Sequence, residues 1–261
     1  MKDKCNREIK NIRFSITSKC NYNCLYCDKE GYVQQGRELT VDEITKICYI
    51  LAKILKVKRI KLTGGEPLCR KEVIQIVQNI YDLGLYDDIS ITTNGYLLLE
   101  KAQDLINAGL NRVNVSLCSL KPEKYSFITG SNSLPRILEG LKKAQDVGLH
   151  PIKLNFVMLK GINDDELEDI VKETSRYCSH VVTSTIKPRR DSLKRLAAIV
   201  PYFKDAKLEK IGNSFYLPSS LRFSFLSRVE KAAKQYGMSF ATCREGYPFK
   251  ASSCDGSHLI P

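Results

Sequence analysis

The chain has 261 residues and a formal net charge of +12, from 41 lysines and arginines against 29 aspartates and glutamates, which suits one large α/β domain or a domain with a smaller extension. It has no run of eighteen apolar residues and no apolar block in its first residues, MKDKCNREIK, which argues against a membrane span and a secretory leader and leads us to expect a cytoplasmic protein. The positive charge suits an anionic partner such as a phosphorylated small molecule or RNA, although lysines on solvated helix faces, as in VEKAAKQ, account for much of it.

Short β-branched runs alternate with longer amphipathic stretches, a pattern typical of βα units with a parallel sheet. The predicted strands are residues 12–17, 59–64, 89–93, 112–117, 152–159 and 180–186. The predicted helices are residues 41–55, 70–83, 98–107, 134–147 and 164–176. Thr40 and Glu43 form a capping box before the first helix, and glycines 84, 109 and 148 end three others. We therefore expect an α/β fold, a partial (β/α)6 TIM-type barrel of parallel strands with its functional site at the carboxyl ends of the strands.

The βα rhythm breaks after about residue 187. Two basic segments follow, KPRRDSLKRL and PYFKDAKLEK, and after them come a predicted helix in FSFLSRVEKAAKQYG and a candidate strand in MSFATC. We expect a core barrel over residues 1–187 and a C-terminal extension over residues 188–261 that packs on the barrel, in a single domain overall.

Three cysteines follow the first predicted strand directly. The segment TSKCNYNCLYC places Cys20, Cys24 and Cys27 in a C-x3-C-x2-C arrangement on one loop. Three thiolates can hold three irons of a cubane cluster and leave the fourth iron open to a reactant. Zinc is the alternative, but zinc normally takes four ligands, and no further cysteine or histidine follows at a short spacing. The spacing therefore favours an iron–sulfur cluster.

The triplet, with Tyr26 before its third cysteine, resembles the signature of the radical SAM superfamily. LTGGEP at residues 62–67 resembles the segment with which that family receives the methionine amino group of S-adenosylmethionine. The resemblance implies a [4Fe-4S] cluster and S-adenosylmethionine as cofactors, and reductive cleavage of S-adenosylmethionine to a 5'-deoxyadenosyl radical that abstracts hydrogen from a substrate. It implies cofactor contacts at Tyr26, Gly64, Gly65, Glu66, Pro67 and Ser116. Asn155 alternates with Lys153 on one strand face and is a further candidate, for a ribose hydroxyl.

Over roughly residues 10–172 the chain resembles the MoaA-like GTP 3',8-cyclases of molybdenum-cofactor biosynthesis. The likeness rests on RFSITSKCNYNCLYC, IKLTGGEPLCRKE, ITTNGYLL, AGLNRVNVSLCSLKPEKYSFITG and IKLNFVMLKGINDDELED, in that order. It implies a nucleotide-like substrate that faces Arg13, Thr92 and Lys153. Lys61 and Arg70 are further candidates for binding an anionic substrate.

The sequence departs from the cyclase pattern at three places. Lys61 stands where the family has arginine, and an ammonium cannot replace a forked guanidinium in bidentate phosphate contacts. Cys118 stands where the family usually has aspartate, and the cyclases' C-terminal second-cluster motif is absent. In its place are Cys243 and Cys254. Either these two join Cys118, Cys178 or His258 in an auxiliary metal site, or they are unligated thiols, which we favour because two ligands are too few.

The pattern as a whole predicts an enzyme that acts on a nucleotide-like or other anionic small molecule, with electrons from a low-potential donor such as a ferredoxin or flavodoxin. Modification of RNA or a peptide is the alternative, and the basic segment RRDSLKR is the feature that would serve RNA. A cluster-carrying or zinc-binding scaffold or regulator is the non-enzymatic alternative. The sequence identifies no general acid or base.

Overall fold

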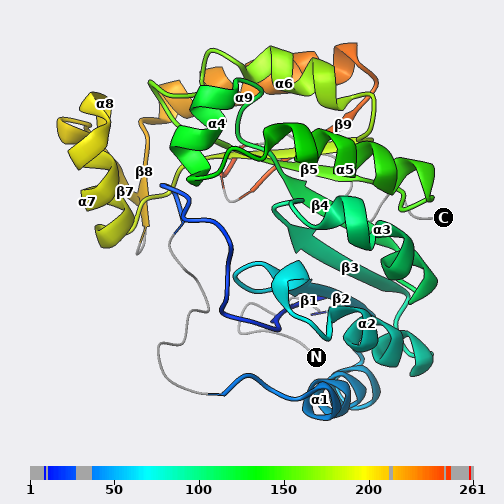
Figure 1. Cartoon of the computed structure of the whole chain (residues 1–261). Helices are drawn as coiled ribbons and strands as arrows, with labels where there is room; N and C mark the ends of the chain where they lie inside the picture. Colours follow the sequence, from blue (N-terminus) through cyan, green and yellow to red (C-terminus); the bar gives the residue numbers. More distant parts are fainter. Residues whose placement is uncertain are drawn as a thin grey trace. The chain divides into compact units, whose positions relative to one another are not determined.

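A computed structural model describes residues 9, 11–27, 37–211, 214–243, 245–247 and 259 (Figure 1). The chain forms two compact units, each built from segments that are not contiguous in sequence. The first unit contains Met1–Asn21, Lys29–Val115 and Pro135–His150, and the second contains Tyr22–Asp28, Ser116–Leu134 and Pro151–Pro261. None of the helices in the described part of the chain is long and apolar enough to cross a membrane.

The first unit is a parallel βα arrangement. Its strands pair in sequence order, as β1 (Asn11–Ser15), β2 (Arg59–Thr63), β3 (Asp88–Thr93) and β4 (Arg112–Ser116). Its helices are α1 (Val41–Lys53), α2 (Val73–Asp82), α3 (Leu98–Asn107) and α5 (Leu134–Asp146), with a short 3-10 turn, η1 (Pro67–Cys69), after β2. Right-handed βα crossovers of this kind place the carboxyl ends of all four strands at the same edge.

The two faces of these four strands carry different side chains. One register row is apolar and consists of Phe14, Leu62, Ile91 and Val113. The neighbouring row lies on the opposite face and is polar, with Arg13, Lys61, Ser90 and Arg112. Successive residues of a strand point to opposite faces. The alternation of apolar and polar residues therefore gives one apolar face, suited to helix packing, and one polar face.

A buried ion pair lies on the polar face of the first unit. Arg112 Nε donates to Asp88 Oδ1 at 3.0 Å and its Nη2 donates to Asp88 Oδ2 at 2.6 Å. The side chains are only 1% and 2% exposed. A forked, two-bond geometry is what allows such a pair to offset the loss of hydration.

The second unit contributes three further parallel strands. Its strands β5 (Lys153–Met158), β6 (His180–Thr185) and β9 (Ser239–Thr242) pair in that order, and β7 (Glu209–Ile211) and β8 (Ser214–Tyr216) form a separate antiparallel pair. Its helices are α4 (Pro122–Thr129), α6 (Leu167–Thr174), α7 (Arg190–Ile199), α8 (Pro201–Lys204) and α9 (Ser219–Gln235). Helix α9 packs against α6, β6 and β9, so the part of the chain after residue 187 supplies both a strand and a covering helix.

The predicted strands and helices are confirmed, including the strand in MSFATC and the helix before it. The capping box is present, with Glu43 N donating to Thr40 Oγ1 at 3.2 Å and Thr40 N donating to Glu43 at 2.8 Å. The sequence prediction missed α4, α7, α8 and the β7–β8 pair. Helix α4 carried recognisable signals, because Pro122 occupies its first turn and Gly130 ends it in a left-handed conformation. The domain boundary expected at residue 187 stays a prediction.

We predict that Asp88→Ala lowers the free energy of unfolding by about 3–5 kcal/mol, because Arg112 would remain buried without its carboxylate. Urea unfolding followed by circular dichroism measures the loss. Asp87→Ala is the matched control: Asp87 lies next in the chain and is 65% exposed, 3.9 Å from Lys58 Nζ. That substitution should cost less than about 1 kcal/mol. Equal losses in the two variants would contradict a special role for the buried pair.

Candidate cofactor site

The three predicted cluster ligands lie on the irregular loop that follows β1. Cys20 and Cys27 are exposed and Cys24 is partly buried. In the described part of the chain, no three cysteine, histidine, aspartate or glutamate side chains gather closely enough to hold a metal ion. The candidate ligand set is therefore defined by its spacing along the loop. Three cysteines within eight residues are a donor set that suits an iron–sulfur cluster.

The turn after β2 lies against the residues that lead to Cys20. Gly65 N donates to Thr17 O at 2.8 Å, and Glu66 N donates to Lys19 O at 2.7 Å. A Cβ atom on Gly64 would lie 2.3 Å from Thr17 O, and one on Gly65 would lie 2.2 Å from Lys19 O. Any side chain at these two positions would collide with main-chain atoms. The glycine pair is therefore required for the two loops to lie this close.

Glu66 fixes this turn from inside. Its side chain is buried and accepts hydrogen bonds from Leu68 N at 3.0 Å, Thr93 Oγ1 at 2.7 Å and Asn94 N at 2.6 Å. Burial raises the pKa of this carboxyl from 4.5 to about 7, and the three donors oppose that rise. The carboxylate thus joins the turn after β2 to the loop after β3, while Pro67 begins the 3-10 turn that follows.

Asn94 extends this network to the cysteine loop. Its Nδ2 donates to Asn21 Oδ1 at 2.8 Å, directly after Cys20, and its Oδ1 accepts from Tyr96 N at 3.0 Å. Sequence reasoning did not select Asn94, although the Asn-Gly pair in ITTNGYLL is a turn signal. The loops after β1, β2 and β3 are consequently linked within the first unit.

The remainder of the cysteine loop belongs to the second unit and lies against the end of α4. Asn23 N donates to Thr129 O at 3.1 Å and Leu25 N donates to Ile128 O at 2.9 Å. The Tyr22 hydroxyl is hydrogen-bonded to Ser133. The Tyr26 hydroxyl is hydrogen-bonded to Cys24, and burial raises the pKa of Tyr26 well above its usual value. Main-chain bonds thus hold the segment that carries Cys24 and Cys27.

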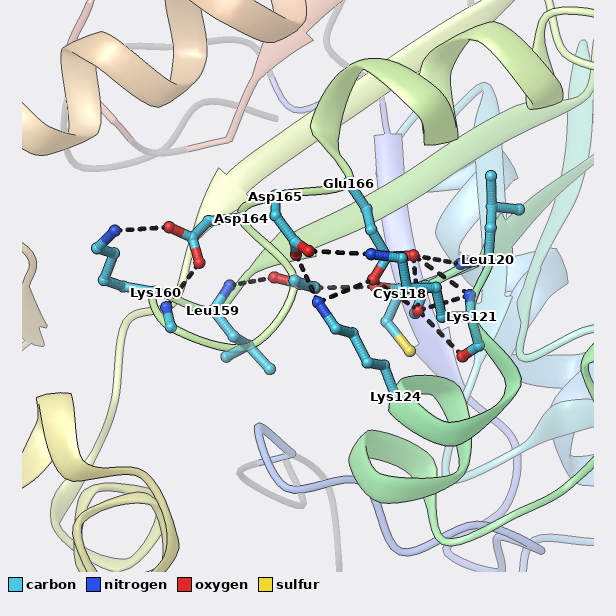
Figure 2. Close-up of polar contacts among 12 residues, drawn as sticks. Cys118, Leu120, Lys121, Lys124, Leu159, Lys160, Asp164, Asp165 and Glu166 are labelled. Carbon is cyan, nitrogen blue, oxygen red and sulfur yellow. Dashed lines mark hydrogen bonds and ion pairs between the residues drawn. The ribbon is translucent and has the colours of Figure 1, made fainter.

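The loops after β4 and β5 are joined by buried polar side chains, as Figure 2 shows. Glu166 accepts from the Ser119 hydroxyl at 2.9 Å, Leu120 N at 3.0 Å and Lys121 N at 3.2 Å. Asn163 Nδ2 donates to Cys118 O at 2.8 Å. The Cys118 side chain is buried, which raises the pKa of its thiol far above the usual range. These contacts fix the loops after β4, which ends at Ser116, and after β5, which carries Asn155; both residues are predicted cofactor contacts.

A third buried carboxylate lies beyond the end of β9. Glu245 accepts from Thr185 N at 2.9 Å, from Lys187 Nζ at 2.6 Å and from Arg222 Nη1 at 3.3 Å. Its side chain is fully buried. Glu245 therefore joins the segment after β9 to the carboxyl end of β6, and sequence reasoning had not selected it.

The predicted substrate contacts lie on the polar strand faces of their units. In the first unit, Arg13 is exposed and is paired in register with the half-buried Lys61. Thr92 is paired in register with Asn114, whose Nδ2 lies 3.4 Å from Thr92 Oγ1. In the second unit, Lys153 is buried and shares its strand face with Asn155. Cations therefore stand side by side on β1 and β2, as an anion site needs.

The structure contradicts the prediction for Arg70. Its side chain is buried, and its guanidinium donates to the carbonyl oxygens of Ile16 and Leu39. Its Nε lies 3.5 Å from Glu72 Oε2. This arginine is a structural clamp on the start of the cysteine loop, so it is not placed to bind a substrate anion.

The candidate auxiliary metal residues are only partly described. Cys243 is exposed, whereas Cys118 and Cys178, two of its suggested co-ligands, are buried. Cys254 and His258 lie outside the described residues. The auxiliary site stays a prediction, as do the roles of the other candidate site residues.

The sequence model of the radical SAM superfamily matches residues 14–174. The chain belongs to this superfamily. Its members use a [4Fe-4S] cluster and S-adenosylmethionine, and these are the cofactors of this radical SAM protein, as predicted. The residues described above fit those cofactors, because one loop supplies three cysteines at close spacing and the glycine pair lets the turn after β2 lie against the start of that loop.

Among curated relatives, "Probable GTP 3',8-cyclase" of Methanocaldococcus jannaschii is 49% identical over 173 residues, which are 66% of this chain and 57% of that protein. "GTP 3',8-cyclase" of Peptoclostridium acidaminophilum is 44% identical over 171 residues, 64% of this chain and 52% of that protein. The chain thus spans little more than half the length of these relatives. The identity over about two thirds of this chain supports the expected cyclase-like core.

Among solved structures, SuiB of Streptococcus suis bound to S-adenosylmethionine superposes with a TM-score of 0.71. The match covers 97% of this chain and 55% of that chain at 15% identity, so it bears on the fold alone. It confirms the predicted α/β class of this radical SAM protein, with parallel strands in an arrangement of the TIM-barrel type.

We predict that Gly65→Ala weakens binding of S-adenosylmethionine by roughly tenfold or more. The added Cβ would force the turn away from Lys19, and overpacking costs of about 1–3 kcal/mol correspond to that loss. Equilibrium dialysis of anaerobically reconstituted protein measures the affinity. Gly84→Ala is the control, since Gly84 has a φ of +63° but open space around it. It should cost about 1 kcal/mol of stability and leave the affinity unchanged. Unaltered affinity in Gly65→Ala would contradict the argument.

We predict that Glu66 makes stability depend on pH. As pH rises from 4.5 to about 7, the unfolded state loses the Glu66 proton first, so the free energy of unfolding should fall relative to Glu66→Gln. The relative fall should be on the order of 3 kcal/mol and be complete above pH 7. Urea unfolding of both proteins in the metal-free form between pH 5 and 8 measures it. Parallel pH profiles would show that the carboxyl is ionised throughout.

Proposed function

We propose that this protein is an enzyme that cleaves S-adenosylmethionine reductively at a [4Fe-4S] cluster held by Cys20, Cys24 and Cys27. When reduced by one electron, such a cluster would supply the electron that splits S-adenosylmethionine into methionine and a 5'-deoxyadenosyl radical, and this radical would abstract hydrogen from the substrate. One observation carries the proposal: the Gly-Gly-Glu turn is hydrogen-bonded to the main chain immediately before Cys20. The segment that leads to the first of the three cysteines is thereby fixed against the turn after β2.

In this proposal the chain's own residues bind and orient. Gly64, Gly65 and the buried Glu66 and Pro67 hold the turn that faces the methionine moiety, and Tyr26 lies between two of the ligands on the loop. Ser116, at the end of β4, and Asn155, within β5, contact the cofactor, and the loops after these two strands are fixed by Glu166 and Asn163. Rigid positioning of this kind, with water excluded, is the protein's share when a cofactor carries the reaction.

The proposed substrate is a nucleotide-like or other anionic small molecule. The register pairing of Arg13 with Lys61 supports it, because two adjacent cations on the polar face suit a phosphate or carboxylate. The names of the relatives point to GTP for those proteins. Lys61 offers one rotatable donor group in place of a fork, so the anion would be held by charge more than by a fixed bidentate geometry.

We predict that anaerobically reconstituted protein holds about four irons per chain and forms 5'-deoxyadenosine when reduced with dithionite. Cys24→Ala should lose most of this iron and the product. Cys178→Ala is the control, since Cys178 is buried and lies outside the loop; it should keep both. Full iron content and product in Cys24→Ala would contradict the ligand assignment.

The same iron assay decides the auxiliary site. In the Cys243→Ala/Cys254→Ala variant an unchanged content of about four irons supports a single cluster, whereas a fall from about eight to about four irons would establish a second one.

A further inference from the structure

One helix beyond the core contacts the loop that carries the proposed cluster ligands. Arg195, on α7, donates from Nη2 to the main-chain oxygen of Cys27 at 2.6 Å. Both residues belong to the second unit, and both are exposed. The exposed side of α7 therefore lies next to Cys27, an exposed cysteine of the triplet.

This surface is basic and partly apolar. Lys194, Arg195, Ala198 and Ile199 are exposed, Ile199 by 46%, and together they form what we name the α7 face. The sequence from Lys194 to Ile199 contains no acidic residue. A large apolar side chain bordered by cations is the composition of a surface that binds an acidic protein, with the charges guiding the encounter.

Reductive cleavage needs a partner of defined chemistry. Each S-adenosylmethionine that is cleaved consumes one electron, which must come from a separate donor. Electron transfer weakens steeply with distance, so the donor has to bind close to the cluster. The contact between Arg195 and Cys27 marks α7 as a place from which a bound carrier is near the ligand loop.

We propose that the α7 face is the docking site for an acidic, low-potential electron carrier, a small flavin or iron–sulfur protein. The proposal rests on the proposed function. The formal net charge of +12 would speed the approach of such a carrier at low ionic strength. RNA is the other polyanion that a basic helix could bind, but the segment from Lys194 to Ile199 has no aromatic side chain on which a base could stack.

The test variant is Lys194→Glu/Ile199→Glu, which keeps Arg195 in place. Its control is Lys231→Glu/Gln235→Glu, which makes the same change in charge at exposed positions on α9 of the same unit. The probe is a flavodoxin. Its affinity for each protein is measured by calorimetry, with and without the reconstituted cluster and at two salt concentrations. Formation of 5'-deoxyadenosine is then compared with reduced flavodoxin and with dithionite as the reductant.

The α7 variant should bind flavodoxin about tenfold more weakly and should lose flavodoxin-driven product in proportion, while its dithionite-driven product stays at the wild-type level. Higher salt should weaken binding to wild type and control alike. Equal binding by the two variants would overturn the proposal, and so would loss of the dithionite-driven reaction, which would assign α7 to loop positioning. Displacement of flavodoxin by a short RNA that binds the α7 face more tightly would also overturn it. If wild type forms no product with dithionite, the proposed function fails, and the affinities without the cluster still test the docking site.

Discussion

Main-chain hydrogen bonds from Gly65 to Thr17 and from Glu66 to Lys19 hold the turn after β2 against the loop after β1. Such an approach leaves no room for a Cβ atom at residues 64 and 65, so the amino-acid identity and the loop geometry depend on each other. The other contacts of this region serve the same arrangement. Glu66 fixes the turn from within, and Arg70 holds the carbonyl of Ile16 where the loop begins. The start of the irregular loop that carries the cysteines is thereby held by hydrogen bonds from the turn after β2 and from Arg70.

Three buried glutamates each satisfy backbone N–H groups next to the end of a strand. Glu66 and Glu166 each accept hydrogen bonds from two main-chain amides of loops that follow strands, and Glu245 accepts one from the amide of Thr185, the last residue of β6. A parallel sheet leaves such loops without strand partners, and a carboxylate with several acceptor sites can satisfy two or three amides at once. A buried carboxyl group costs less when it accepts several hydrogen bonds, although at Glu66 burial still raises the pKa. These three side chains therefore hold the backbone in place next to the strand ends.

Periodicity and local turn signals were sufficient to predict the alternating strands and helices, because each depends on residues close together in sequence. The cysteine triplet and the glycine turn were found for the same reason. The clamp made by Arg70 could not be read in this way, since its partners Ile16 and Leu39 are distant in sequence and are main-chain atoms. The buried positions of Glu166 and Glu245 could not be predicted either, because a glutamate in a polar segment is expected at the surface. Helix α7 was missed because its many basic residues obscure its apolar periodicity, and the contact of its Arg195 with the main chain of Cys27 joins residues far apart in sequence.

The segment that carries Cys24 and Cys27 has its main-chain partners in Thr129 and Ile128, more than one hundred residues further along the chain. A growing polypeptide presents these two thiols long before α4 exists to hold them, and contacts between distant residues form late. The loop therefore reaches its final conformation only after about half of the protein has been synthesised. If these two thiols hold iron, they reach the conformation that receives it only after α4 has folded, and they are open to oxidation in the interval before.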